Sequence, residues 1–246
     1  MAYVDKATGI TSQIYEDGIL NIFTDASINP LGNNKWDGCA GAIPTHYEEN
    51  SLTIYEHGPT LMVIRDCTNN IAELSAIELA CDIALKKQTE YHRINVFSDS
   101  EYSVKTLKQW IFGWAKISCR NIGVDGFRNM KKSDGMPVKN HTIIINIINK
   151  ILSIDPKVCQ FNIYHVKAHT NGDYKRVQSQ FLKANGIRIN DCDAKILGYF
   201  NDEVDNKTRD LLLSEASIYY ERKVVPYAIV PYGFNDYKHI IGGREF

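Results

Sequence analysis

Two short stretches of the chain, NIFTDAS at residues 21–27 and NVFSDSE at residues 95–101, run apolar residues directly into an aspartate. Both are rich in β-branched and aromatic residues, which is typical of buried strands. Because side chains alternate along a strand, Asp25 and Asp99 each share a face with the phenylalanine two residues earlier. If the two strands are neighbours, their aspartates lie side by side at one edge of a sheet.

Two adjacent carboxylates repel each other, so at least one pKa rises unless a cation neutralises the pair. Hard oxygen ligands of this kind select Mg²⁺ or Mn²⁺ over zinc. A purely structural interpretation also exists. Ser98-x-x-Glu101 and Asn70-x-x-Glu73 resemble capping boxes, in which the acidic residues near them only complete helix N-termini.

The bulk composition excludes several other classes of protein. The 246 residues are 44% hydrophobic and 23% charged, which suits one domain with insertions, and the formal charge of −1 means that a polyanion must meet a local basic patch. The six cysteines form no CxxC pair and no cluster with histidine, which argues against a zinc site or a disulfide framework. With no apolar signal or membrane-spanning run, we expect an intracellular, cytoplasmic protein, with nuclear and viral settings still open.

The order of periodic segments predicts an α/β plan with a mixed sheet. Strands are expected at 19–24 and at 39–47. The segments SLTIYEHG and TLMVI then complete a three-strand antiparallel meander. A helix from Asn70 precedes a strand at 93–98 and a helix over about 100–112. Two further segments are interpreted as a helix at 141–154, where a strand is the alternative, and a strand at 158–166. Residues 170–200 are polar and ambiguous, and a last helix begins with the acidic residues near 201.

Seven blocks of the sequence occur in the order and with the character of ribonuclease H type 1 domains: IFTDAS, CTNNIAEL, FSDSEYSV, QWIFGWAK, MPVKN, HVKAHT and NDEVDNKT. The chain resembles this family from residue 19 to about residue 215. The resemblance implies a five-stranded mixed sheet, three antiparallel strands followed by two parallel ones, flanked by helices. It also implies a metal-dependent endonuclease that hydrolyses the RNA strand of RNA·DNA hybrids, with two Mg²⁺ ions for which Mn²⁺ can substitute, and that leaves 5′-phosphate and 3′-hydroxyl ends.

The family's four metal-binding carboxylates would be Asp25 on the first strand, Glu73 on the first helix, Asp99 at the end of the fourth strand and Asp205 at the start of the last helix. For the fourth, about thirty residues separate His169 from Asp205, a longer stretch than compact members of the family have. Asp193 is its competitor. Asp205 is preferred because Asn201 precedes it with the family's spacing, although Thr208 replaces the usual alanine. His169 matches the family histidine that assists proton transfer or product release, and its alternative role is that of an ordinary surface histidine.

Nine residues are assigned to substrate binding by the same resemblance: Asn29, Thr68, Asn69, Asn70, Glu101, Trp110, Trp114, Lys116 and Asn140. The three amides at 29, 69 and 70 can read a 2′-hydroxyl in a wide minor groove, and Asn70 is also a potential helix cap. Thr68 and Asn140 match a pocket for a phosphate of the DNA strand. Glu101 stands where the family often has glutamine, which adds a negative charge next to Asp99.

Both tryptophans and Lys116 match the start of the family's basic protrusion, which would span residues 113–137. This stretch carries five basic side chains: Lys116, Arg120, Arg128, Lys131 and Lys132. Phosphate contacts from such a handle give affinity without sequence choice. The alternative is a solvated loop over tryptophans that belong to the core. His165, inside a predicted strand, is interpreted as a structural histidine.

The expected organisation is a leader at 1–18, one domain at 19–221 with an insertion near 170–200, and an aromatic tail at 222–246. The tail is a candidate docking arm for a protein partner, no membrane contact is expected, and the oligomeric state is open. Two other functions stay under consideration. One is a different nuclease on the same fold, a junction resolvase or an exonuclease, and the other is an inactive nucleic-acid-binding module.

Overall fold

The computed structural model describes residues 12, 14, 16–32, 35–48, 51–54, 59–122, 126–167 and 172–214. The strands are β1 (Ile19–Gly32), β2 (Lys35–Glu48), β3 (Ser51–Ile54), β4 (Thr60–Ile64), β5 (Arg93–Ser98) and β6 (Gln160–His165). The α-helices are α1 (Asn69–Lys87), α2 (Glu101–Lys105), α3 (Ile111–Ile122), α4 (His141–Leu152), α5 (Tyr174–Asn185) and α6 (Asp191–Leu213), and a π-helical turn, η1 (Thr106–Trp110), joins α2 to α3.

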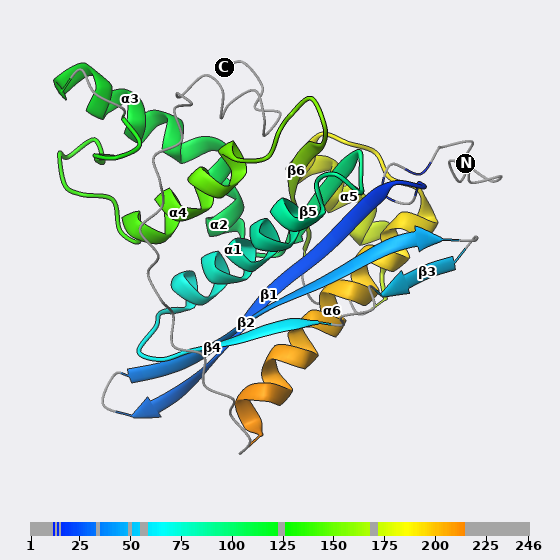
Figure 1. The fold of residues 1–246 in the computed structure, drawn as a ribbon. Helices are drawn as coiled ribbons and strands as arrows, with labels where there is room; N and C mark the ends of the chain where they lie inside the picture. Colours follow the sequence, from blue (N-terminus) through cyan, green and yellow to red (C-terminus); the bar gives the residue numbers. More distant parts are fainter. Residues whose placement is uncertain are drawn as a thin grey trace.

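The described strands form one mixed sheet in the order β3-β2-β1-β5-β6, with β4 also paired to β2 (Figure 1). β2 pairs antiparallel with β1, β3 and β4, whereas β1, β5 and β6 are mutually parallel. Both β3 and β4 lie on the edge of β2 that faces away from β1, so they occupy one position in succession. The predicted five-stranded sheet of three antiparallel and two parallel strands is therefore confirmed, with its third strand divided in two.

Helices cover both faces of this sheet, as Figure 1 shows. On one face, Leu20 and Ile22 of β1 are fully buried in a cluster that includes the apolar stripes of α1 and α4. On the other face, Phe23 stacks on Phe97 at 5.1 Å between ring centroids and on Phe200 of α6 at 5.0 Å. Because side chains alternate along β1, its residues pack into two separate cores, one on each face of the sheet.

A row of buried asparagines links the three parallel strands. Asn95 donates from Nδ2 to Oδ1 of Asn21, and Asn162 donates from Nδ2 to Oδ1 of Asn95, both at 3.0 Å. These residues are also register partners in the β1–β5 and β5–β6 pairings. Each asparagine begins the same triplet of asparagine, aliphatic residue and aromatic residue, so the phrase noticed twice in the sequence is present a third time, in β6. Because a shifted register would leave these amides unpaired in the core, the row selects one alignment of the strands.

Four segments differ from the sequence expectation. The first is β1, which was expected to end at residue 24 and continues to Gly32. The helix expected over 100–112 is confirmed in position but is built from α2, η1 and α3, and it continues to Ile122, into the stretch expected to form the basic protrusion. The polar segment 170–200 contains α5 and the beginning of α6. The expectation that the last helix starts near residue 201 is wrong, because α6 begins at Asp191, where the Asn190 side chain accepts a hydrogen bond from the Asp193 amide at 2.7 Å. The helix expected at 141–154 is confirmed as α4.

We expect Asn95→Ala to lower the free energy of unfolding by about 2–5 kcal/mol. The substitution leaves the side-chain Oδ1 of Asn21 and the side-chain Nδ2 of Asn162 buried without their shared partner. Urea unfolding followed by circular dichroism would measure the change. Asn206→Ala, at an exposed position of α6, is the matched control and should change stability by less than about 1 kcal/mol. Equal, small effects for both variants would contradict a structural role for the asparagine row.

Candidate active site

Three carboxylates from distant parts of the chain meet at one edge of the sheet. Asp25 lies within β1, Asp99 directly follows β5, and Glu73 lies in the first turns of α1. One carboxylate oxygen from each lies within 4.8 Å of the others. The parallel pairing of Thr24 with Ser98 brings the two aspartates together, as the repeated phrase in the sequence predicts.

Burial makes these charges costly to leave uncompensated. Asp25 is 5% exposed and Glu73 is 7% exposed. Burial, followed by the nearby Asp99 carboxylate, raises the pKa of Asp25 to about 8, although the Ala26 amide donates a hydrogen bond to its Oδ1 at 2.7 Å. Burial and the neighbouring charge of Asp25 also raise the pKa of Glu73 well above its usual value. Among the described residues, Oε2 of Glu73 has no hydrogen-bond partner.

An all-oxygen cluster that is buried, mutually repulsive and incompletely hydrogen-bonded fits a hard divalent cation. A cation would offset the repulsion that raises both pKa values, and it would give the Glu73 oxygen a partner. Asp25, Glu73 and Asp99 are the residues that would hold it.

The structural interpretation of these acids as parts of capping boxes is wrong. Thr68, not Asn70, is the N-cap of α1 and accepts from the Ile71 amide at 3.4 Å. Ser100, not Ser98, is the N-cap of α2. Glu73 and Asp99 are therefore not needed to complete either helix N-terminus.

The two competing residues for the fourth carboxylate lie in different surroundings on α6. Asp193 is fully buried in the first turn, where its Oδ1 accepts a hydrogen bond from Ser12 at 2.6 Å. Asp205 lies well inside α6, which corrects the expectation that it starts the last helix, and its negative charge contributes to the raised pKa of both Asp25 and Glu73. Of the two, only Asp205 acts electrostatically on the cluster.

The approach of α6 to the cluster depends on a glycine opposite Asp25. Gly41 is the register partner of Asp25 on β2, and a Cβ added there would lie 2.6 Å from the Thr208 methyl carbon. Thr208 also shares a hydrogen bond with Ser27 of β1 at 2.8 Å between hydroxyl oxygens. The threonine that departs from the family's alanine thus fixes α6 to β1 one turn after Asp205, whose side chain pairs with Arg209 at 2.5 Å.

Two histidines, His165 and His169, were assigned roles from the sequence. His169 lies outside the described residues, so its role stays a prediction. His165, expected to be structural, ends β6, and its Nε2 lies 3.1 Å from the backbone oxygen of Asp99. The imidazole therefore supports the backbone that carries one of the clustered carboxylates.

The residues expected to read the hybrid are distributed around the cluster. Asn69 and Asn70 are the first two residues of α1, directly after the exposed cap Thr68 and one turn before Glu73. Asn29 is half-buried on β1, four residues beyond Asp25, and pairs with Asp37. Their proximity to the carboxylates along β1 and α1 is consistent with substrate binding, which stays a prediction.

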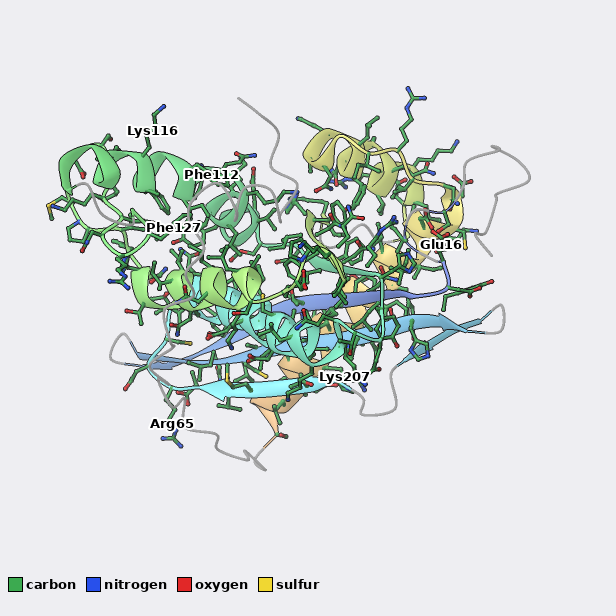
Figure 2. The ribbon with its side chains drawn as sticks, turned by 45° about the horizontal axis from the view of Figure 1, so that its top comes forward. Glu16, Arg65, Phe112, Lys116, Phe127 and Lys207 are labelled. Carbon is green, nitrogen blue, oxygen red and sulfur yellow. The ribbon has the colours of Figure 1, made fainter. Side chains whose placement is uncertain are left out.

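The expected basic protrusion begins with a row of aromatic side chains. Trp110 is 39% exposed, which excludes a fully buried core role, and its ring lies 6.0 Å from that of Trp114. Tyr102, which sequence reasoning missed, contacts Trp110 edge-on at 5.8 Å and accepts a hydrogen bond from Asn140 at 3.2 Å. Figure 2 shows Lys116 extending from α3 away from the rest of the molecule.

The extra negative charge of Glu101 is paired within its own helix. Its carboxylate lies 2.5 Å from Lys105 Nζ, and this hydrogen bond and charge lower the Glu101 pKa. Glu101 is exposed and does not belong to the three-carboxylate cluster. The salt bridge offsets the charge that distinguishes this position from the family's glutamine.

Comparison with known proteins identifies the family. The RNase H family model matches residues 17–183, more than half of the 246 residues. This chain belongs to the RNase H family. The match contains Asp25, Glu73, Asp99 and His169 but ends before Asp193 and Asp205, so it does not decide between the two candidates for the fourth carboxylate.

Several curated ribonucleases H are similar in sequence to this chain. The chain is 32% identical over 80 residues to the ribonuclease H of Tropheryma whipplei strain Twist, covering 32% of this chain and 41% of that protein. It is 30% identical over 132 residues to the ribonuclease HI of Haemophilus influenzae strain Rd, covering 54% and 70% respectively. It is also similar to LC9-RNase H1, a type 1 RNase H with the type 2 active-site motif, with a TM-score of 0.48, 15% identity, and coverage of 72% of this chain and 76% of that one.

The chain spans less than two thirds of the length of several of these curated relatives, 41% of the Tropheryma protein and 62% of an Edwardsiella ictaluri ribonuclease H. In the part of the chain that the structure describes, no helix combines the length and apolar character needed to cross a membrane. Among the described residues, the cysteines at positions 39, 67, 81, 159 and 192 are not joined in disulfides.

We expect Asp25→Asn to stabilise the metal-free protein at pH 8 by at least about 1.4 kcal/mol. This is the free energy that corresponds to a difference of one unit between the pKa values of the folded and unfolded states. The Asp25 pKa of about 8 in the folded state exceeds its ordinary value of 3.8, so the unfolded chain gives up this proton first. The wild type should therefore lose stability as the pH rises from about 4 to about 8, and the variant should lose less.

Thermal unfolding in EDTA across this pH range would measure the difference. Asp210→Asn, at an exposed position of α6, is the control and should leave the pH dependence unchanged. Adding Mg²⁺ should raise the melting temperature of the wild type more than that of Asp25→Asn. A variant that is less stable than the wild type at pH 8 without metal would contradict the raised pKa.

Proposed function

We propose that this protein is a metal-dependent endoribonuclease that hydrolyses the RNA strand of RNA·DNA hybrids. The observation that carries the proposal is the convergence of Asp25, Glu73 and Asp99 within 4.8 Å in a chain that belongs to the RNase H family. Such a cluster is expensive to bury, and an observed concentration of perturbed carboxylates is a physical indication of a reactive site.

In this proposal the three clustered carboxylates, together with Asp205, hold two Mg²⁺ ions. When bound, the ions would supply a water nucleophile with a lowered pKa and neutralise charge at the leaving 3′-oxygen, which gives 5′-phosphate and 3′-hydroxyl ends. The raised pKa values mean that the carboxylates must lose their protons to take up metal, so we propose that activity rises with pH through the neutral range. His169 would carry a proton to or from the reacting groups.

Hybrid selectivity in this proposal comes from groups beside the cluster. The amides of Asn29, Asn69 and Asn70 can both donate to and accept from a 2′-hydroxyl, which DNA lacks. Thr68 and Asn140 would bind a phosphate of the DNA strand. Trp110, Trp114 and Lys116 would hold the duplex farther away, where contacts to phosphates do not depend on sequence.

We expect Asp25→Asn and Glu73→Gln each to reduce cleavage of a labelled RNA·DNA duplex in Mg²⁺ by more than about 100-fold. Changing a residue that only supports a metal ligand costs up to about that much activity, and changing a ligand itself should cost more. Both variants should still fold and bind the hybrid, because the substitutions keep side-chain size and remove only the charge. Gel analysis of the products measures cleavage and the ends formed. Full metal-dependent activity in either variant would contradict the proposal.

The same assay separates the alternatives. Hybrid, double-stranded RNA and a four-way DNA junction should be compared in parallel, in Mg²⁺ and in Mn²⁺. Preferred cutting of the junction would favour a resolvase, and stepwise shortening from an end would favour an exonuclease. Tight binding with no turnover in either metal would favour an inactive binding module.

The fourth carboxylate can be tested by a matched pair of substitutions on α6. Asp205→Asn should lower kcat by about 10- to 100-fold or more with little loss of stability, because it is half-buried and acts on the cluster. Asp193→Asn should mainly destabilise, because Asp193 is fully buried and accepts the Ser12 hydroxyl. Kinetics and urea unfolding of both variants check this. The reverse pattern would assign the fourth position to Asp193.

A further inference from the structure

A groove of about 440 Å³ lies beside the carboxylate cluster, and none of the proposed catalytic residues that the structure describes lines it. Its walls come from α2 and η1 on one side, α5 on the other, and the end of β6 between them. The residues that give it its character are Lys105, Lys108, His165, Lys167, Gln180 and Lys183. The groove thus combines segments that are remote in the sequence, and α5 lies in the stretch where sequence reasoning expected only an insertion.

The groove is a local concentration of positive charge in a chain whose formal net charge is −1. Four lysines line it against one acidic residue, Glu101, which is already paired with Lys105. Lys108 is held in place, since its Nζ donates to the Ile163 backbone oxygen at 2.9 Å. Among the described residues, Lys167 and Lys183 form no ion pair, and both are exposed. Their charges are therefore available to an anion from outside the protein.

The α5 wall is fixed firmly to the end of β6. Asn185 accepts a hydrogen bond from the His165 amide at 3.0 Å and donates to the His165 backbone oxygen at 2.8 Å. These two bonds reproduce a strand-like pairing across the last residue of β6 and hold the C-terminal turn of α5, which carries Lys183, over the groove. A charge on a well-fixed element loses little conformational entropy when it binds a ligand.

The groove and the cluster share the same edge of the sheet. β5 and β6 are parallel and end together, so Asp99 after β5 lies next to His165 at the end of β6, and the two are joined by a hydrogen bond of 3.1 Å. A strand whose phosphodiester lies at the carboxylates can continue into the groove past His165. α1 packs mainly against β1 and β2, which lie on the other side of β5 from β6. The groove is therefore separate from the residues at the start of α1 that are expected to read the minor groove.

We propose that this groove binds backbone phosphates of the cleaved strand just beyond the scissile linkage, with Lys167 and Lys183 as its main phosphate contacts. The inference rests on the proposed function and deepens it. It assigns a substrate-binding role to α5 and makes the groove a phosphate site additional to the Thr68–Asn140 pair and to the protrusion. A backbone ligand suits the lining, which offers charges and amides and contains no phenylalanine, tyrosine or tryptophan on which a base could stack.

The test compares hybrid binding by Lys167→Gln/Lys183→Gln and by a control double variant, Lys86→Gln/Lys157→Gln. The control lysines lie at the end of α1 and before the start of β6, at the opposite edge of the sheet. All proteins carry Asp25→Asn to prevent cleavage, and binding of a labelled hybrid is measured by fluorescence anisotropy over a series of KCl concentrations. Circular dichroism and melting curves verify folding.

We expect the Lys167/Lys183 variant to bind roughly tenfold more weakly at moderate salt, with the slope of log K against log salt reduced in magnitude by about 2, about 1 for each phosphate contact. The control should keep the parental affinity and slope. An unchanged slope in the groove variant, or an equal change in both variants, would overturn the inference while leaving the proposed cleavage intact. Failure of every protein to bind hybrid at low salt would count against the proposed function itself.

The position of the site is tested by shortening the duplex. Hybrids shortened on the side of the cleavage position that reaches the groove should bind the groove variant and its parent with equal affinity. Hybrids shortened on the other side should keep the difference in affinity. A difference that persists whichever side is trimmed would place the two lysines elsewhere than along the cleaved strand, and it would overturn the proposal.

Discussion

The parallel register of β1, β5 and β6 is the constraint on which the candidate site depends. Asn21, Asn95 and Asn162 bond to one another through the core, and the aromatic residue two positions later in each strand stacks on its neighbour, Phe23 on Phe97 at 5.1 Å and Phe97 on Tyr164 at 5.5 Å. Counting four residues from the first two asparagines leads to the two aspartates. A shift of one residue would turn one carboxylate to the opposite face, so the row of amides and rings aligns the chemistry as well as the strands.

The site concentrates charge in a place where the protein alone stabilises it poorly. Asp25 and Glu73 are almost fully buried, one Glu73 oxygen has no described partner, and Asp205 adds a further negative charge from α6. Gly41 permits this approach because any larger residue opposite Asp25 would meet Thr208. The fold thus maintains a repulsive arrangement by packing around it, which is expected where a cation and a phosphate complete the charge balance.

Much of this arrangement could be predicted from local sequence patterns. The two strands that carry Asp25 and Asp99, the first helix with Glu73 and the mixed sheet follow from periodicity over short windows, which packing did not override. The helix at 141–154 follows from the length of its apolar run. Local patterns were less informative for α5 and the beginning of α6, because residues 170–200 are polar and their helices depend on caps at Asp173 and Asn190 and on contact with the sheet. The π-helical turn at Thr106–Trp110 was also missed, since it inserts a residue into an otherwise regular helical pattern.

The sequence by itself determined which residues could do metal chemistry and that Asp25 and Asp99 would follow apolar strand residues, because side-chain type and strand alternation are local properties. The expectation that the first strand ends at Asp25 was wrong, because β1 continues to Gly32. The sequence left the choice between Asp193 and Asp205 open, and only the tertiary structure distinguishes them electrostatically, since that depends on how far along α6 the helix crosses β1. The same is true of the basic groove. Its lysines come from α2, η1, α5 and the end of β6. No pattern in the sequence predicts that packing brings these four segments together.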